Sequence, residues 1–252
     1  MMGESVLEAF VIFLGNPRSG TTLVRSLLDA HQQVIISNEE HLLPLIDRGL
    51  SWEEALERIE VNAQRFRDNP RWTNYSYQIA TDDSLTAQPI KVVGDKKAGS
   101  STRYLMQNPT SIHHLQEWCP IPIKVLHCVR NPLDVIATEY LRNGLTLSIE
   151  LNIYRYFVVE KEAVRLGKML GNNQYHQLHQ ESLIAQPVEE MKKLLNFLDL
   201  EGSTAYFNAC QQAIYEKPNQ SRSQIDWTPE LQQKVNRFAQ SIPHLSAYLK
   251  QE

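Results

Sequence analysis

The chain has 252 residues, of which 42% are hydrophobic and 21% charged, and its formal net charge is -4. This balance suits one globular domain over residues 1–252 and argues against nucleic-acid binding through bulk charge. Three cysteines without metal-ligand spacing (Cys119, Cys128 and Cys210) are expected to stay reduced. The acidic N-terminus and the shortness of the apolar runs favour a cytoplasmic protein without a membrane segment.

The apolar run Phe10–Leu14 predicts a buried strand, and the helical spacing of apolar residues in Leu23–Leu28 predicts a helix. Between them lies the run Gly15-Asn16-Pro17-Arg18-Ser19-Gly20-Thr21-Thr22. A strand, a small-residue loop and a helix start place backbone N–H groups and the positive end of a helix dipole at one point, which is an anion site. Arg18 adds a positive charge to that loop.

The spacing from Gly15 to Gly20 is that of the phosphate loop G-x-x-x-x-G-K-[ST], but Thr21 stands in place of the lysine. In that motif the lysine and the next hydroxyl handle the terminal phosphates and Mg²⁺ of a nucleoside triphosphate. The departure therefore indicates another phosphate-type ligand. An ordinary strand-to-helix turn is the alternative interpretation.

A second short strand is expected at Val34–Ile36, and it is followed by Glu39, Glu40 and His41. A helix is expected over residues 52–67, because Ser51 and Glu54 form a capping box before it. The long irregular stretch Asp68–Pro89 is either a lid over an acceptor or a surface loop with packed aromatic residues.

A third strand is expected at Ile90–Val93, followed by Lys96 and Lys97, and then helices over 103–107 and 110–118. The next strand is expected at Ile123–Val129. Pro132 suits the first turn of the helix after it. Arg130, before that helix, and Thr138, in its second turn, can both reach one anion.

The rest of the chain continues the alternation of strands and helices. A long helix is expected over 148–170 with most of its aromatic residues in the core, a fifth strand at Gln174–His179 and a helix at Val188–Leu198. A polar, basic loop that contains Ser221 and Arg222 precedes a helix start at Thr228. The pattern predicts an α/β protein with a P-loop-like three-layer fold, a parallel sheet of roughly five strands flanked by helices.

Several of these segments resemble the sulfotransferases that use 3′-phosphoadenosine 5′-phosphosulfate (PAPS). The run from Pro17 to Leu23 resembles their 5′-phosphosulfate loop, and its continuation to Glu40 is most similar to tyrosylprotein sulfotransferases and their bacterial relatives. Gly94–Ala98 resembles the family segment G-D-K-x-P, with Ala98 in place of proline. Arg130–Thr138 resembles the 3′-phosphate segment R-x-P-x-D-V-x-x-S, with Thr138 in place of serine.

The resemblance implies transfer of a sulfonyl group from PAPS to a hydroxyl or amine, with adenosine 3′,5′-bisphosphate (PAP) as product and no metal. It implies Glu40 as general base, with Arg18 and Lys96 as further catalytic residues, and His41 as the alternative base. The choice between Lys96 and Lys97 for the sulfonyl group stays open. The expected donor-binding residues are Pro17, Arg18, Ser19, Gly20, Thr21, Thr22, Lys97, Arg130, Thr138, Ser221 and Arg222.

Other interpretations also remain. A nucleotide-dependent kinase would use a similar loop, and a non-catalytic protein that binds adenosine bisphosphate would use the same two anion sites. The acceptor is a small molecule or a peptide, and the sequence does not decide between them. A homodimer is possible in principle, but no pattern in the sequence specifies the oligomeric state.

Overall fold

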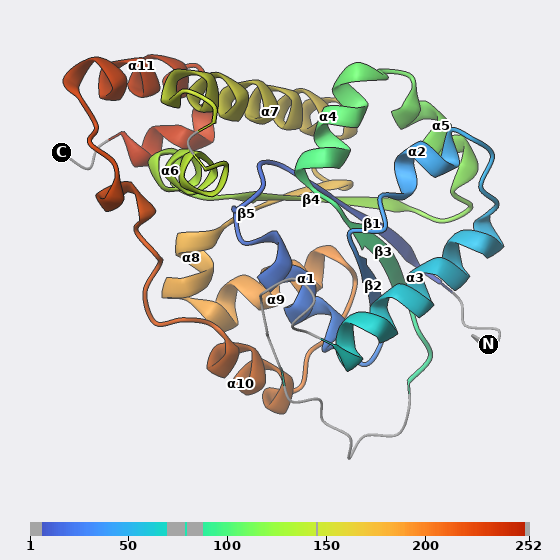
Figure 1. The fold of residues 1–252 in the computed structure, drawn as a ribbon. Helices are drawn as coiled ribbons and strands as arrows, with labels where there is room; N and C mark the ends of the chain where they lie inside the picture. The colour runs from blue at the N-terminus through green and yellow to red at the C-terminus, as the bar shows by residue number, and fades with distance from the viewer. Residues whose placement is uncertain (1–6, 70–78, 80–87, 145, 250–252) are drawn as a thin grey trace.

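The computed structural model describes residues 7–69, 79, 88–144 and 146–249. Five parallel strands form one sheet in the order β2-β3-β1-β4-β5. Their bounds are Ala9–Leu14 (β1), Val34–Asn38 (β2), Val92–Lys96 (β3), Ile123–Val129 (β4) and Tyr175–His179 (β5). The predicted α/β fold with a five-stranded parallel sheet is confirmed, and Figure 1 shows the helices on both sides of the sheet.

Helices alternate with the strands along the chain. Their bounds are Thr21–Asp29 (α1), Leu42–Ile46 (α2), Trp52–Asp68 (α3), Gly99–Gln107 (α4), Ser111–Trp118 (α5), Pro132–Arg142 (α6), Ile149–Leu170 (α7), Gln180–Ala185 (α8), Pro187–Phe197 (α9), Thr204–Ala213 (α10) and Pro229–Ala239 (α11). Two 3₁₀ helices, η2 (Ser221–Gln224) and η3 (Pro243–Tyr248), lie on either side of α11 in the sequence. Within the described ranges, no helix is long and apolar enough to cross a membrane.

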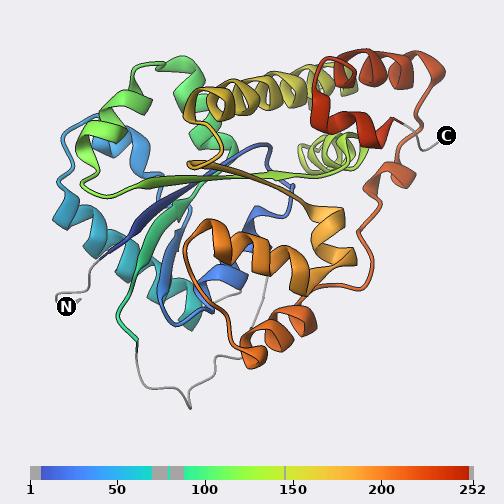
Figure 2. The same cartoon turned by 180° about the vertical axis from the view of Figure 1, so that it is seen from behind.

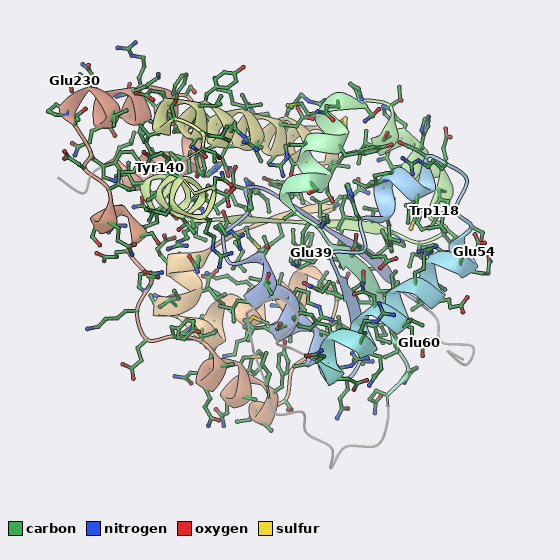
Figure 3. The ribbon with its side chains drawn as sticks, in the orientation of Figure 1. Glu39, Glu54, Glu60, Trp118, Tyr140 and Glu230 are labelled. Carbon is green, nitrogen blue, oxygen red and sulfur yellow. The ribbon has the colours of Figure 1, made fainter. Side chains whose placement is uncertain are left out.

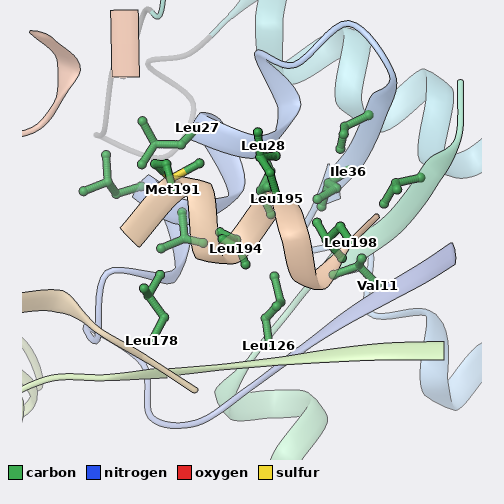
Figure 4. Close-up of a cluster of buried hydrophobic side chains, with 14 of the residues drawn as sticks. Val11, Leu27, Leu28, Ile36, Leu126, Leu178, Met191, Leu194, Leu195 and Leu198 are labelled. Atoms are coloured by element: carbon green, nitrogen blue, oxygen red, sulfur yellow. The ribbon is translucent and has the colours of Figure 1, made fainter. Parts of the chain in front are cut away.

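The central strand β1 is buried on both faces, as its continuous apolar sequence requires. Val11 and Phe13 join a cluster with leucines of α1 and α9, and Figure 4 shows this packing around Val11 and Leu126. Phe10 and Ile12 point to the other face, where residues of α2, α3, α4, α5 and α7 cover them. Figure 2 shows the same two layers from behind.

The parallel arrangement brings the carboxyl ends of the strands to one edge of the sheet. Ser37 pairs in register with Asp95, and Asn38 pairs with Lys96 at the ends of β2 and β3. The loop that follows β1 leads into α1 beside them. The segments after β1, β2, β3 and β4, all chosen from the sequence as site segments, therefore meet at this edge.

One strand was predicted with the wrong bounds, and some short helices were missed. The third strand runs over Val92–Lys96 and not Ile90–Val93, so Asp95 and Lys96 belong to the sheet. Most of the aromatic residues of α7 lie in the core as expected, since Tyr156 and Phe157 are buried, whereas Tyr154 is 58% exposed. The short helices α2 and α8 were not anticipated. Most of the Asp68–Pro89 segment lies outside the described residues.

Candidate active site

The loop between β1 and α1 has a left-handed backbone at three positions: Gly15 (φ 104°), Arg18 (φ 68°) and Gly20 (φ 85°). A Cβ atom on Gly15 would lie 2.7 Å from the ring of His127, so only glycine fits there. The Gly15 N–H donates to Thr102 Oγ1 at 2.9 Å, which ties the loop to α4. Gly20 is the N-cap of α1, whose first turn has no acidic residue, so the positive end of the helix dipole faces the loop uncompensated.

A cavity of about 710 Å³ opens beside this loop. It brings together the two segments expected from the sequence to bind anions, since both the β1–α1 loop and Arg130 with Thr138 line its wall. The rest of the wall comes from α8 and from the chain after α10. The lining residues are Arg18, Gly20, Thr21, Thr22, Leu23, Arg130, Thr138, Gln180, Ile184, Tyr215, Glu216, Lys217 and Asn219.

Arg130 connects the two anion-binding segments. One terminal nitrogen of its guanidinium group donates to the carbonyl oxygen of Arg18 at 3.1 Å, and the other donates to the carbonyl oxygen of Asn219. The Arg18 side chain lies against α6, where its Nε donates to Glu139 Oε1 at 3.1 Å. The positions of the loop and of Arg130 are therefore coupled.

Thr138 and Ser221 lie side by side, with their hydroxyl oxygens 2.9 Å apart. Arg222, expected from the sequence as a further anion ligand, contacts Asp134 of α6. Its backbone N–H and its guanidinium group both donate to the carboxylate of Asp134, at 2.9 and 2.6 Å. Arg222 therefore fixes η2 against α6, while Ser221 is the residue of η2 that reaches Thr138.

Two buried polar atoms in these segments, Ser19 Oγ and Arg130 Nε, have no hydrogen-bond partner within the part of the chain that the structure describes. Both atoms can donate hydrogen bonds, and an unpaired buried donor is costly. These atoms, together with the loop and the start of α1, form a donor set that fits a ligand with two separated phosphate-type groups. PAPS and PAP are ligands of this kind.

Lys96 lies at the end of β3 with its side chain 2% exposed. Its Nζ donates to Thr22 Oγ1 at 3.2 Å and to Glu39 Oε1 at 3.0 Å. Lys97 Nζ contacts the other oxygen of Glu39 at 3.2 Å. In Figure 3 Glu39 lies near the middle of the molecule, close to the start of α1. Lys96 at the end of β3 therefore connects Thr22, at the start of α1, with Glu39, which follows β2.

The charges in this group influence one another. Burial alone would raise the pKa of Glu39, but the charges and hydrogen bonds of Lys96 and Lys97 outweigh it, so that its pKa lies below the ordinary glutamate value. Burial lowers the pKa of Lys96, and the neighbouring Glu39 opposes that shift. Glu39 is therefore held as a carboxylate next to a poorly hydrated ammonium group.

Glu40 points elsewhere. Its two carboxylate oxygens accept hydrogen bonds from Arg58 at 3.0 Å and from Asn62 at 2.9 Å, and both partners belong to α3. Its backbone N–H donates to Asp95 Oδ1 at 3.1 Å. Of the two adjacent glutamates, Glu39 is the one that contacts Lys96, whose ammonium group also contacts Thr22. The sequence alone did not separate them, because two neighbouring carboxylates after a strand give the same signal.

His41, the alternative base, is the N-cap of α2 and lies edge-on to Tyr104 with ring centroids 6.1 Å apart. Burial, followed by the charges of Lys97 and Arg103, lowers the pKa of His41. Arg18, Glu39, His41 and Ala98 are four of the five non-glycine residues with positive φ in the described ranges. Backbone strain of this kind gathers at functional sites, and here it lies after β1, β2 and β3.

Several lining residues of the cavity were missed from the sequence. Gln180 and Ile184 lie on α8, and Tyr215 and Glu216 follow α10. None of these residues belongs to a motif with a fixed spacing. The available signal was the polar, basic loop before Thr228, from which only Ser221 and Arg222 were chosen.

The fold and this edge of the sheet define an α/β protein with a P-loop-like anion site. A profile described as "Sulfotransferase family" matches residues 10–204, and the chain belongs to this family. A relative from Caenorhabditis briggsae is 30% identical over 209 residues, 79% of this chain and 68% of that protein. Protein-tyrosine sulfotransferase 2 of Gallus gallus is 26% identical over 206 residues, 78% of this chain and 53% of that protein.

The fold is similar to that of solved sulfotransferases. The sulfotransferase domain of the Synechococcus PCC 7002 olefin synthase has a TM-score of 0.59 at 18% identity, covering 96% of this chain and 98% of that one. Mouse sulfotransferase SULT7A1, complexed with PAP, has a TM-score of 0.54 at 12% identity over 96% and 85% of the chains. The chain spans 42% to 54% of the length of four relatives described as protein-tyrosine sulfotransferases, the Gallus gallus protein among them.

Proposed function

We propose that this protein transfers a sulfonyl group from PAPS to a hydroxyl or amine of an acceptor. One observation carries the proposal: a single cavity of about 710 Å³ is lined both by the β1–α1 loop and by Arg130 and Thr138. PAPS carries a phosphosulfate and a separate 3′-phosphate on one nucleoside, and it would occupy both segments together. A nucleoside triphosphate would leave the second segment without a ligand.

In this proposal the phosphosulfate lies against Pro17–Thr22, with Ser19 Oγ among its donors. The 3′-phosphate lies against Arg130 and the paired hydroxyl groups of Thr138 and Ser221. Arg222, predicted from the sequence as a direct ligand, acts instead through Asp134 by holding η2 in place. Lys97, also predicted to bind the donor, is proposed to act on it indirectly by holding Glu39 in position.

When bound, PAPS supplies an activated sulfonyl group. The bond between sulfur and the acceptor oxygen or nitrogen forms as the bond between sulfur and the 5′-phosphate oxygen breaks, and the acceptor proton moves to a carboxylate. Lys96, Arg18 and the N–H groups at the start of α1 are placed to balance the charge that grows on the phosphate and sulfonyl oxygens. Lys96 is favoured over Lys97 for the sulfonyl group, because Lys96 also reaches Thr22.

The proposed general base is Glu39. It lies after β2 beside Lys96, which also contacts Thr22 of the donor loop, whereas Glu40 is held by Arg58 and Asn62 of α3. The assignment of Glu40 made from the resemblance thus stays a prediction that the geometry does not favour. His41 remains available as a second candidate, because its Nε2 has no hydrogen-bond partner within the described part of the chain.

The kinase alternative needs an aspartate that holds Mg²⁺, and Asp95 is the residue that the sequence offers. The oxygens of Asp95 already accept hydrogen bonds from the Ser37 hydroxyl and from the backbone N–H groups of Glu40 and Leu42. Asp95 thus has a structural task, which is to shape the chain after β2. This observation favours sulfonyl transfer over magnesium-dependent phosphoryl transfer.

The acceptor is proposed to be a hydroxyl compound or a peptide, and the relatives described as protein-tyrosine sulfotransferases make a tyrosine peptide one member of the test panel. The deciding experiment is calorimetry with PAP and with ATP·Mg, followed by turnover of PAPS labelled in the sulfonyl group. The expected result is PAP binding without comparable ATP binding, and label on at least one acceptor. Preference for ATP would support a kinase, and PAP binding without turnover would support a non-catalytic binder.

A further inference from the structure

A group of buried polar residues contacts the β1–α1 loop. It consists of Asn16 in the loop, His127 on β4, Glu160 on α7 and His244 on η3. Glu160 and His127 are fully buried, and Asn16 is 4% exposed. None of the four residues lines the cavity. A carboxylate in such a place must be stabilised by its neighbours, because burying an unpaired charge is costly.

Glu160 is the centre of the group. Its Oε1 accepts a hydrogen bond from the Asn16 amide at 2.9 Å. Its Oε2 lies 3.0 Å from His244 Nε2 and 3.3 Å from His127 Nε2. The same Asn16 amide donates to the carbonyl oxygen of Tyr156 at 3.1 Å. Asn16 is thus held at two points of α7, and the loop is held with it.

The imidazole of His127 is fixed as well. Its Nδ1 lies 2.5 Å from the Tyr175 hydroxyl, and its ring fills the space that a Cβ atom on Gly15 would need. Burial would raise the pKa of Glu160, but His127 and His244 outweigh it and bring this pKa to about 2. These neighbours favour the ionised carboxylate, which accepts the hydrogen bond from the Asn16 amide.

A second set of contacts starts from the same 3₁₀ helix, η3, and ends beside Arg130. The Tyr248 hydroxyl lies 3.0 Å from His179 Nδ1 and donates to Glu181 Oε2 at 2.7 Å. Glu181 Oε1 accepts a hydrogen bond from the backbone N–H of Asn131 at 2.8 Å. His244 and Tyr248 therefore brace the two anion-binding segments from behind, one segment each.

We propose that Glu160 is a positioning residue for the donor site, which it serves by fixing the β1–α1 loop through Asn16, and that Tyr248 does the same for the Arg130 segment through Glu181. This inference rests on the proposed function. Hydrogen-bond donors bind a phosphosulfate more tightly when they are already held in position before the ligand binds. Small misplacements of reacting groups lower the reaction rate. The residues of η3 thus belong to the donor site although they line none of its cavity.

The test compares Glu160→Gln, Asn16→Ala and their double variant by calorimetry with PAP and by steady-state kinetics. Glu160→Gln is expected to weaken PAP binding by about tenfold or more and to raise the KM for PAPS, with the KM for the acceptor unchanged. Because both residues act through one contact, the double variant is expected to lose little more than the worse single variant. Additive losses would overturn the proposal.

Tyr206→Phe is the matched control for stability alone. It removes a buried hydrogen bond, from the Tyr206 hydroxyl to the carbonyl oxygen of Leu27 at 2.9 Å, at a site outside this group. It is expected to lower the melting temperature and leave PAP affinity unchanged. If Glu160→Gln behaves in the same way, the inference fails. If Glu160→Gln does not fold, Asn16→Ala decides for the β1–α1 loop and Tyr248→Phe for the Arg130 segment, since unchanged PAP affinity in both variants overturns the proposal.

Metal analysis of the purified protein adds a separate outcome, because His127, Glu160 and His244 offer ligand atoms within 4.8 Å of one another. Glu160 forms a hydrogen bond with His244 and lies at ion-pair distance from His127, and no bound metal is expected. One equivalent of zinc that Glu160→Gln loses would overturn the proposal in favour of a metal site. A wild-type protein that fails to bind PAP would instead contradict the proposed function, so the two failures are distinguishable.

Discussion

The ammonium group of Lys96, at the end of β3, lies 3.0 Å from a carboxylate oxygen of Glu39, at the end of β2. The same ammonium group lies 3.2 Å from Thr22 Oγ1 in the first turn of α1. One buried cation therefore touches both the proposed base and the proposed donor loop. This arrangement orients Glu39 towards the loop, and it separates Glu39 from Glu40, which α3 holds.

The two glutamates are expected to differ strongly when each is changed to glutamine. Glu39→Gln removes the proposed base and should lower turnover by about 100-fold or more. Glu40→Gln breaks a partly exposed pair with Arg58 that is worth about 1 kcal/mol at most, so turnover should change by less than about fivefold. Initial rates with labelled PAPS measure both. The reverse ranking would restore Glu40 as the base.

The pKa of Glu39 gives a prediction for the dependence on pH. Since this pKa is lowered in the folded protein, the carboxylate is ionised at all pH values above about 4.3, the ordinary glutamate value. The stabilisation that its pairing with Lys96 and Lys97 contributes is present above that value and is lost as the pH falls through the folded pKa. Acid unfolding of wild type and Glu39→Gln should converge only below pH 4.3 or so. Convergence near neutral pH would contradict the assignment.

Arg130→Gln should weaken PAP binding by about 10- to 100-fold, because it removes a charge-assisted contact to the 3′-phosphate. Adenosine 5′-diphosphate lacks that phosphate, and its affinity should change much less. Titration of both nucleotides into both proteins measures the difference. Equal losses would mean that Arg130 acts only on the loop, through its hydrogen bond to the carbonyl oxygen of Arg18.

Gly15→Ala tests the close contact between the loop and β4. The new Cβ atom would meet the His127 ring at 2.7 Å and the Cys128 carbonyl oxygen at 2.8 Å, in a backbone conformation that alanine disfavours. The free energy of unfolding should fall by about 1–3 kcal/mol. Gly171→Ala is the control, since Gly171 also has positive φ but a Cβ atom there has no neighbour within 4 Å. If urea unfolding shows a similar loss of stability in both variants, the positive φ accounts for the loss and the contact with His127 does not.

Metal independence is the remaining expectation from the sequence. Turnover in the presence of EDTA should equal turnover with added Mg²⁺, because the charge on the donor is balanced by Lys96, Arg18 and the helix N-terminus in the proposed mechanism. An assay with EDTA, Mg²⁺ and Mn²⁺ side by side measures this. Loss of turnover in EDTA that Mg²⁺ restores would return the kinase-like alternative to consideration.

The sequence predicted the architecture well where local patterns were strong. The capping box of Ser51 and Glu54 and the strand Ile123–Val129 are present as expected. The third strand was predicted too early in the chain, because Asp95 and Lys96 are residue types typical of loops. In the structure, the side chains of Asp95 and Lys96 find polar partners inside the site, and the strand includes them. Propensity cannot anticipate such pairing across the sheet.

Some residues of the site could likewise be identified from the sequence, and others could not. The β1–α1 loop and the Arg130 segment each carry a motif with fixed spacing, so their residues could be chosen from the sequence. The choice between Glu39 and Glu40 depends on a positive φ at Glu39 and on partners in α3 that lie about twenty positions further along the chain, and no spacing rule contains that information. The roles of Asp134 and Glu160 could not be predicted for the same reason, because their partners Arg222 and Asn16 lie far from them in the sequence.

The match to the family ends at residue 204, but the molecule does not divide there. The cavity wall at Tyr215–Lys217, the Ser221 hydroxyl beside Thr138 and the η3 contacts to Glu160 and Glu181 all come from the chain after that point. A recombinant fragment that stops at the limit of sequence similarity would keep all five strands and yet present an open, unsupported nucleotide site. The limit of recognisable similarity is therefore a poor guide to where this protein can be cut.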